Sequence, residues 1–332
     1  HAGLLDVSYA LPGRQGLTMK RLFVLCGAAV AGGIAAAAAL AAWPVGTSPG
    51  SINLEGDVDR GAYLARASGC IACHTNFAAG GKPLAGGAAL ETPFGVFHPP
   101  NITTDPDAGI GNWTVQDFAK AVRQGISPEG EPYYPVFTYP FYARFTDQQI
   151  ADLWAAFQTV APVAEAAPAH EVTFPFDQRW GLKLWRAAYL QEPATDPVDG
   201  RGDLWNRGRE LVRGAAHCGA CHTDRNIAGA RIVEAALAGS NDLPGGGKAP
   251  SIRSGTLKAD GWTVSSLAYA LRTGTTPSGD SFGGSMGEVV RQGTRFLTDT
   301  DRQAIATYLL DSEVGSATQT SAASTGTTTE TN

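Results

Sequence analysis

Two copies of the pattern Cys-x-x-Cys-His constrain this 332-residue chain more than any other feature. They start at Cys70 and Cys218 and together use four of the five cysteines and two of the six histidines. Two thiols one short turn apart can add to the two vinyl groups of one porphyrin, and the adjacent histidine then falls under the iron. The sequence therefore predicts two covalently attached haem c groups. The attachment residues are Cys70, Cys73, Cys218 and Cys221, and the proximal ligands are His74 and His222.

Other uses of paired cysteines fit the sequence less well. A zinc ribbon places its two Cys-x-x-Cys knuckles about 15–20 residues apart, whereas 144 residues separate Cys73 from Cys218. A thioredoxin-like motif lies beside a βαβ pattern, and neither motif is flanked by a buried β run. A disulfide in each copy suits an oxidising compartment, but it leaves the trailing histidine unexplained in both copies.

The overall charge and composition exclude several partners. The net charge is −6, and a negatively charged chain is not expected to bind nucleic acid. No Gly-rich nucleotide fingerprint precedes a clear helix, so nothing indicates a flavin or a nicotinamide cofactor. A chain of this length is expected to form about two domains.

The N-terminal part carries a targeting signal. The basic pair Lys20-Arg21 precedes an apolar run rich in Ala and Gly, from Leu22 to Trp43. This order is typical of a secretory signal peptide, and the run also reaches the length of about 20 residues that a membrane span needs. We expect residues 1–50 to be upstream residues followed by a cleaved signal peptide or a retained inner-membrane anchor. Both alternatives place the rest of the chain in the periplasm.

The two motifs belong to a repeated unit. About forty residues after each motif comes a segment that begins Trp-Thr-Val and ends in Gly, at residues 113–125 and 262–274. Thr146 and Thr298, which are typical N-cap residues, then precede apolar positions at helical spacing. We expect two helical domains, a structured linker rich in aromatic residues and a disordered Ser/Thr-rich tail. Their bounds are 51–165 for domain 1, 166–202 for the linker, 203–312 for domain 2 and 313–332 for the tail.

The repeats differ in the residue that could bind each iron from the side opposite its proximal histidine. Met286 precedes the final helix of the second repeat, and we expect it to be the sixth ligand there, because a thioether ligand raises the potential. The aligned position of the first repeat is Tyr134, and the loop around it has no Met, His or Lys. For the first haem we expect His98 as the ligand. His170, a tyrosine or an open iron are the alternatives.

Several phrases in the first repeat resemble those of a known family. They are Gly86-Gly87, Thr92-Pro93-Phe94-Gly95, Pro100-Asn101-Ile102-Thr103-Thr104-Asp105, Gly109-Ile110-Gly111-Asn112-Trp113 and Tyr133-Tyr134-Pro135. These phrases look like the cytochrome c subunits of periplasmic alcohol, aldehyde and gluconate dehydrogenases, and the order of the helices resembles that of class I cytochromes c. The resemblance implies an all-α protein with two tandem class I cytochrome c-like domains. Relatives commonly have Met where this chain has Phe137 or Phe145, and many carry a third haem motif that this chain lacks.

The family resemblance implies that the protein transfers electrons. The donor would be the catalytic subunit of a periplasmic dehydrogenase, and the acceptor would be a quinone, another cytochrome or a terminal oxidase of the respiratory chain. No residue of this chain then has to catalyse a reaction, because the cofactor carries the chemistry. The alternative is a dihaem enzyme of the peroxidase or thiosulfate-oxidising type, which would use an open or weakly ligated first haem.

Overall fold

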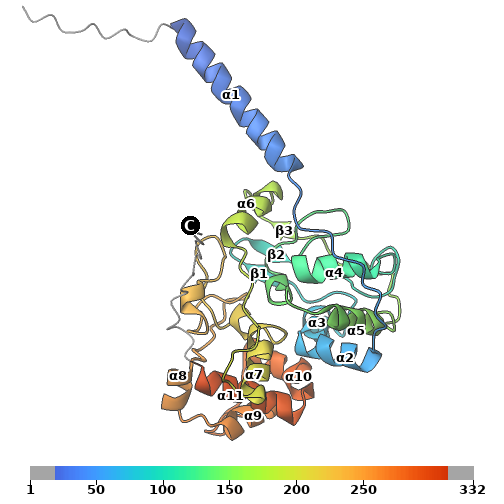
Figure 1. Cartoon of the computed structure of the whole chain (residues 1–332), viewed down its shortest axis with the longest axis vertical. Helices are drawn as coiled ribbons and strands as arrows, with labels where there is room; N and C mark the ends of the chain where they lie inside the picture. The colour runs from blue at the N-terminus through green and yellow to red at the C-terminus, as the bar shows by residue number, and fades with distance from the viewer. Residues whose placement is uncertain (1–18, 313–332) are drawn as a thin grey trace, which may run out of the picture. The chain divides into compact units, whose positions relative to one another are not determined.

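The N-terminal apolar run forms one long helix in the computed structural model, which describes residues 19–312 (Figure 1). This helix, α1 (Met19–Ala42), belongs to a unit that ends at Pro44, and the chain from Val45 onward forms a second unit. Across the described residues, no helix combines the length and the apolar character needed to cross a membrane. The signal-peptide and anchor alternatives stay predictions. Residues 1–18 and the predicted tail 313–332 lie outside the described part of the chain.

The second unit is built mainly from short helices joined by long loops, in the order that the sequence repeat predicts. The expected domain 1 holds α2 (Val58–Ala67), α3 (Cys70–Cys73), η1 (Phe77–Ala79), α4 (Val115–Gln124), η2 (Tyr139–Phe141) and α5 (Asp147–Phe157). The expected domain 2 holds α7 (Asp203–Arg213), η3 (Cys218–Ala220), η4 (Val233–Ala235), α8 (Ser254–Ala259), α9 (Val264–Thr273), α10 (Gly284–Gln292), η5 (Thr294–Phe296) and α11 (Asp299–Asp311).

The helix boundaries follow from local side-chain chemistry. Thr146 and Thr298 cap α5 and α11 as predicted, because each threonine hydroxyl accepts a hydrogen bond from the backbone N–H three residues later. In the middle helices, Gly125 and Gly274 adopt the left-handed conformation that ends α4 and α9. A glycine takes this conformation without steric cost. Both middle helices therefore end where the repeat pattern indicated.

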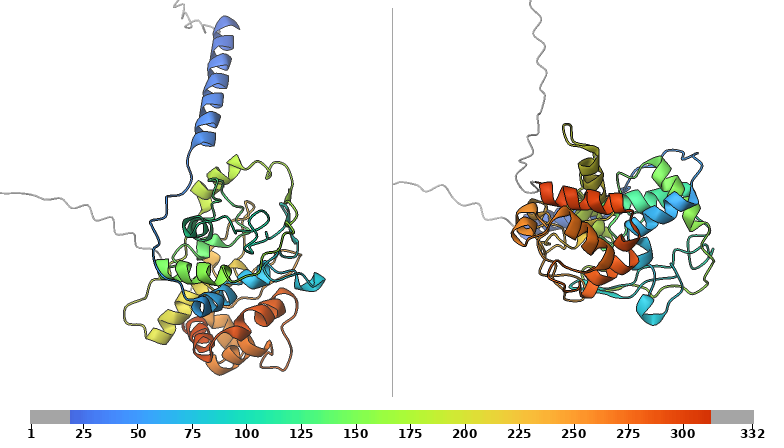
Figure 2. Two further views of the ribbon diagram at one scale, coloured as in Figure 1. Left: turned by 90° about the vertical axis from the view of Figure 1, so that its right-hand side faces the viewer. Right: turned by 90° about the horizontal axis from the view of Figure 1, so that it is seen from below.

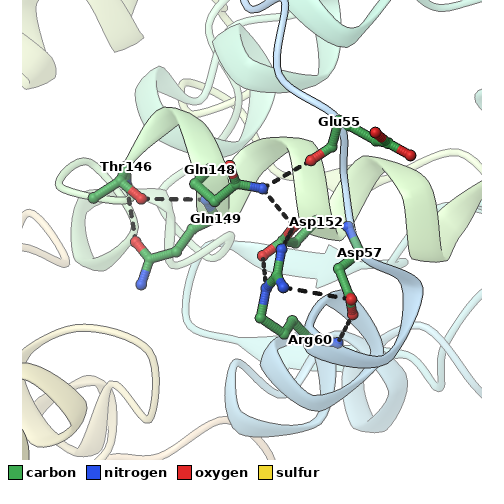
Figure 3. A network of polar contacts seen from close by, with 7 residues as sticks. All are labelled: Glu55, Asp57, Arg60, Thr146, Gln148, Gln149 and Asp152. Atoms are coloured by element: carbon green, nitrogen blue, oxygen red, sulfur yellow. Dashed lines mark hydrogen bonds and ion pairs between the residues drawn. The ribbon is translucent and has the colours of Figure 1, made fainter.

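In each repeat, the first and the last helix cross at a glycine. Helix α2 packs on α5 and α7 packs on α11 (Figure 1). A Cβ on Gly61 would overlap the carbonyl oxygen of Asp152, and a Cβ on Gly208 would overlap that of Ala304. Only glycine lets the two backbones approach so closely. The α2–α5 crossing is also closed by a polar network around Arg60 and Asp152 (Figure 3).

A small antiparallel sheet departs from the all-α expectation. Strands β1 (Leu90–Thr92), β2 (Gly95–Phe97) and β3 (Glu171–Val172) form it in the order β1-β2-β3. Strand β3 lies in the expected linker, together with helix α6 (Trp180–Tyr189). The pairing of Gly95 with Val172 joins the linker to domain 1. Strands of two or three residues are too short to show the alternation that identifies a strand in a sequence, which explains why the sheet was not expected.

One hydrophobic core runs through both repeats. Buried residues of the first repeat, such as Phe118 and Tyr142, belong to the same cluster as Leu211 and Leu309 of the second. The helices of the two repeats accordingly lie directly against each other (Figure 2). A smaller cluster of Phe97, Tyr134 and Leu182 lies between the sheet and α6. The shared core fixes the two Cys-x-x-Cys-His motifs relative to one another.

Candidate haem attachment sites

The first motif forms a single helical turn. Gly69, in the left-handed conformation, precedes α3, and the backbone N–H groups of Cys73 and His74 donate to the carbonyl oxygens of Gly69 and Cys70. This turn brings two thiols and one imidazole close together within one pentapeptide. The arrangement is the one that attachment to a single porphyrin requires.

The second motif reaches a similar arrangement by a different backbone path. Residues Cys218–Ala220 form a 3₁₀ turn, and the backbone N–H of His222 donates to the carbonyl oxygen of Cys218 at 3.0 Å. The residue before the turn is His217, with φ 35° and ψ 41°. A left-handed conformation is uncommon for a residue other than glycine and is more frequent for Asn, Asp and His. The surrounding structure must therefore hold His217 in place.

The two histidines that the sequence predicts as proximal ligands are oriented in the same way. Nδ1 of His74 donates to the carbonyl oxygen of Pro100 at 2.7 Å, and Nδ1 of His222 donates to that of Pro250 at 2.8 Å. A carbonyl only accepts, so the proton sits on Nδ1 and Nε2 keeps its lone pair. A second hydrogen bond of this kind commonly fixes the ring of a metal-binding histidine. Burial lowers the pKa of both imidazoles, which favours the neutral form that binds metal.

The four motif cysteines are unpaired in the structure. Burial raises the pKa of Cys70 to about 12, that of Cys73 to about 11 and that of Cys218 to about 12. Burial also raises the pKa of Cys221. Within residues 19–312, no group of three or more His, Cys, Asp and Glu side chains could hold a metal ion by themselves. The donor set therefore fits a porphyrin-bound iron and does not fit a zinc site.

The loop after each motif is held by a matching threonine. The buried hydroxyl of Thr75 accepts from the backbone N–H of Leu84, and that of Thr223 accepts from Leu237. Each threonine directly follows the histidine of its motif, His74 or His222. The role of Pro100 and Pro250 was not predicted from the sequence. A shared Pro-x-Ile phrase, which recurs as Pro250-Ser251-Ile252, is the signal that could have revealed it.

Pro100 begins a phrase whose next residue anchors the loop. The Nδ2 of Asn101 donates to the carbonyl oxygens of Val163 and Glu165, and its Oδ1 accepts from the backbone N–H of Thr103. Asn101 is buried, so these bonds satisfy a side chain that would otherwise be costly to desolvate. They fix the segment that presents the Pro100 carbonyl to the histidine ring.

Met286, the predicted sixth ligand of the second haem, lies in the first turn of α10. As the sequence predicted, it precedes the final helix, α11, but it lies in a short helix of its own. Its side chain is partly buried and packs against the shared core. Its role as an iron ligand stays a prediction.

His98, the predicted sixth ligand of the first haem, lies beside the expected linker, and its buried Nε2 makes no hydrogen bond to any described residue. Its Nε2 lies 3.5 Å from Oε1 of Glu171, and its backbone N–H donates to Nδ1 of His170 at 3.2 Å. It stands two residues before Pro100, whose carbonyl contacts the proximal ring of His74. The roles of His98 and of the alternative His170 as iron ligands stay predictions.

The region aligned with Met286 in the first repeat is aromatic. Tyr134 donates its hydroxyl proton to the carbonyl oxygen of Phe176 at 3.2 Å, and the Arg179 guanidinium lies over its ring. Phe137 packs against the shared core and Phe145 is buried in it. The described residues therefore present phenyl rings at both positions where the resembling family commonly has Met.

Comparison with known proteins agrees with these sites. Residues 58–157 match the family model described as Cytochrome c. The chain is 42% identical to the "Diheme cytochrome c-type" protein of Cereibacter sphaeroides over 77% of this chain and 86% of that protein. It is 39% identical to the gluconate 2-dehydrogenase cytochrome c subunit of Pantoea cypripedii over 79% of this chain and 61% of that subunit. It is 38% identical to the cytochrome c subunit of the quinone alcohol dehydrogenase of Gluconobacter oxydans over 83% of this chain and 59% of that subunit. The match thus spans about three fifths of the two dehydrogenase subunits.

Proposed function

The chain belongs to the c-type cytochromes that include the diheme protein of Cereibacter sphaeroides, and from this we propose that it carries electrons from a partner dehydrogenase toward the respiratory chain. The observation that carries the proposal is the repeated site. Two motifs in one chain each combine paired thiols with an imidazole that donates to a proline carbonyl. Haem c supplies a one-electron iron couple when it is bound at such a site.

The side chains of this protein hold and insulate the cofactors. Cys70, Cys73, Cys218 and Cys221 would form the thioether bonds, and His74 and His222 would bind the two irons. The carbonyls of Pro100 and Pro250 fix the imidazole rings. Cys70 and Cys218 pack against the shared core, which anchors both motifs to it.

We propose that the two haems have unequal potentials. Met286 binds the second iron as its sixth ligand, and a thioether ligand raises the reduction potential of the haem. The first repeat has no thioether at either Phe137 or Phe145, so its site has the lower potential. Electrons therefore flow from the first site to the second.

The names of the relatives indicate the class of donor. Related cytochrome subunits serve gluconate 2-dehydrogenase, quinone alcohol dehydrogenase and fructose dehydrogenase. We propose a periplasmic location, with a dehydrogenase catalytic subunit as donor and a quinone, another cytochrome or a terminal oxidase as acceptor. The alternative of a peroxidase or thiosulfate-oxidising enzyme finds no support among these relatives.

A redox titration of the two-haem protein tests the assignment of the second site. We expect two one-electron steps, and we expect Met286→Leu to lower the higher step because leucine keeps the apolar packing but removes the sulfur. Val289→Ala, at an exposed position of the same helix, is the control and should leave both steps unchanged. The ligand assignment fails if Met286→Leu moves neither step.

Electron delivery is tested by mixing the oxidised holoprotein with a gluconate, alcohol or fructose dehydrogenase catalytic subunit and its substrate. We expect at least one donor to reduce the haems, as seen in their absorbance bands. The rate of this reduction should depend on the concentration of the catalytic subunit. If none of these dehydrogenases reduces the protein, the proposed donor class is wrong.

A further inference from the structure

The residues that directly precede the two motifs touch each other. A Cβ placed on Gly69 would lie 3.2 Å from Cε1 of His217. Gly69 also has φ +67°, a conformation that side chains disfavour. The chain therefore uses glycine where the turn before Cys70 meets the residue before Cys218.

Tyr142, which belongs to the first repeat, contacts the residues on both sides of this meeting point. Its hydroxyl donates to the carbonyl oxygen of Ser68 at 2.7 Å and accepts from the hydroxyl of Thr138 at 2.9 Å. The rings of Tyr142 and His217 meet edge to face, with centroids 5.8 Å apart and an interplanar angle of 87°. One buried phenol thus binds the backbone two residues before Cys70 and packs on the residue before Cys218.

His217 is fixed within its own repeat as well. Its Nδ1 donates to the carbonyl oxygen of Ala215 at 2.8 Å and lies 3.4 Å from the Tyr142 hydroxyl oxygen. The neighbouring Phe141 ring lies 3.7 Å from a Cβ built on Gly219, which is inside the second motif. The rings of Phe141 and Tyr142 both pack on the His217 ring, with centroids 6.0 and 5.8 Å from it, and these contacts hold a histidine whose backbone is left-handed.

Other contacts join the two repeats away from Gly69 and His217. The Tyr63 hydroxyl donates to Oδ2 of Asp301 at 2.6 Å, and the Arg66 guanidinium lies 4.4 Å from the centre of the Phe296 ring. Helix α3 of the first motif also packs against α10, the helix that carries Met286. Of these contacts, only the packing of α3 on α10 involves an attachment turn.

We propose that Tyr142 and His217 are positioning residues that hold the two attachment turns in direct contact. Electrons then pass between the two sites inside the chain. This inference rests on the proposed function. In the step, one electron leaves the reduced site at His74, which is oxidised, and reduces the site at His222. No bond forms or breaks, and no proton has to move. Because electronic coupling decreases steeply with distance, a small separation of the turns slows the step.

The test measures electron transfer between the sites in the purified two-haem protein. One electron is injected by a photoexcited reductant, and its redistribution between the two haems is followed by absorbance. Gly69→Ala inserts a methyl group against the His217 ring, and we expect transfer to slow by about tenfold or more, since small displacements of reacting centres have effects of that size. Tyr142→Phe keeps the ring but loses the bond to Ser68, and a smaller slowing is expected.

A conservative variant and a matched control separate positioning from general stability. His217→Asn keeps a polar group and tolerates the left-handed backbone, so it should retain more of the rate than His217→Ala. Tyr63→Phe removes an interface hydrogen bond away from the turns, so it should lower stability and leave the transfer rate unchanged. Magnetic coupling between the oxidised haems should weaken in Gly69→Ala and persist in Tyr63→Phe.

The proposal is overturned if Gly69→Ala, Tyr142→Phe and His217→Ala all bind two haems and transfer electrons at the parent rate. If Gly69→Ala or His217→Ala fails to retain both haems, Tyr142→Phe decides the test, because it removes only the hydroxyl group. A Tyr142→Phe protein with two haems and the parent rate then overturns the proposal. Failure of every dehydrogenase to reduce the protein would instead count against the proposed donor and would leave the rate between the sites unaffected.

Discussion

Arg60 and Asp152 join the first and last helices of the first repeat, α2 and α5, through two parallel hydrogen bonds. Nε of Arg60 donates to Oδ2 of Asp152 at 2.8 Å, and Nη2 donates to Oδ1 at 2.9 Å (Figure 3). The second repeat contains an equivalent pair, since Arg207 donates two parallel hydrogen bonds to Asp301. In both repeats the arginine stands directly before the glycine at the helix crossing.

Replacement of Asp152 by Asn should destabilise the protein by about 1.5–3 kcal/mol, the range for hydrogen bonds to charged groups. Asp152 is buried, and it also accepts from the backbone N–H of Asp57 and from Gln148. Denaturant unfolding measures the change. Asp107→Asn, at an exposed loop position, is the control and should change the free energy of unfolding by less than about 0.5 kcal/mol.

The same carboxyl gives the protein a predictable acid sensitivity. Hydrogen bonding by the Arg60 side chain lowers the pKa of Asp152 from 3.8 to about 2. The folded state therefore binds this proton less readily than the unfolded chain. The stabilisation is fully present above pH 3.8 and is lost as the pH falls through about 2. In Asp152→Asn, unfolding measured across this window should depend less on pH, and an unchanged pH dependence would contradict the assignment.

Glycine at the helix crossings should be irreplaceable. Gly61→Ala and Gly208→Ala each place a methyl group onto a backbone carbonyl of the facing helix, so each should destabilise the protein by about 1–3 kcal/mol or more. Gly181→Ala is the matched control, because it lies in helix α6 and a Cβ there meets no atom within 4 Å. This control should be neutral or stabilising by up to about 1 kcal/mol. Thermal and denaturant unfolding of the three variants distinguish these outcomes.

The number of haems is checked by removing one pair of thiols at a time. Cys70→Ala with Cys73→Ala should leave a protein that carries one covalent haem by mass spectrometry, and Cys218→Ala with Cys221→Ala should do the same. Cys26→Ala, which changes the cysteine outside both motifs, should leave two haems attached. A parent protein with a single haem, or an unchanged mass in either double variant, would contradict the assignment of two sites.

The sequence predicted the parts of the fold that depend on local chemistry. Thr146 and Thr298 were recognised as N-caps because a threonine before an apolar helical pattern has few other roles. Gly125 and Gly274 were recognised as helix ends for a similar local reason. The repeat then implied that the two halves share one order of helices, as the structure shows.

The remaining features depend on contacts between distant segments. The strand pairing of Gly95 with Val172 joins residues far apart in the sequence, and it places His98 beside Glu171. No local pattern reveals such a neighbour, so His98 was chosen only because it is a histidine in domain 1. His217 directly precedes Cys218, and its neighbours in the sequence do not reveal its structural role. Its contact with Gly69 comes from the packing of one repeat on the other, which a single sequence does not display.

Phe137 provides a direct test of why the two sites differ. Its ring packs on the core 6.2 Å from the ring of Tyr142, which itself bonds the carbonyl of Ser68 just before the first motif. Methionine fills nearly the same apolar volume and adds a thioether. Phe137→Met should therefore fold, bind iron at the first site and raise the lower of the two potentials. A redox titration and the thioether-to-iron absorption band measure both effects.

Phe145→Met is the matched comparison, because the resembling family also carries Met at this position and the ring is likewise buried. If Phe145→Met raises the lower potential and Phe137→Met does not, the open coordination position of the first site faces Phe145. If neither variant moves the lower step, the first iron already has a sixth ligand from another segment, and the explanation of the lower potential by two phenyl rings is wrong. A shift in the higher step in either variant would instead reverse the assignment of the two potentials to the two motifs.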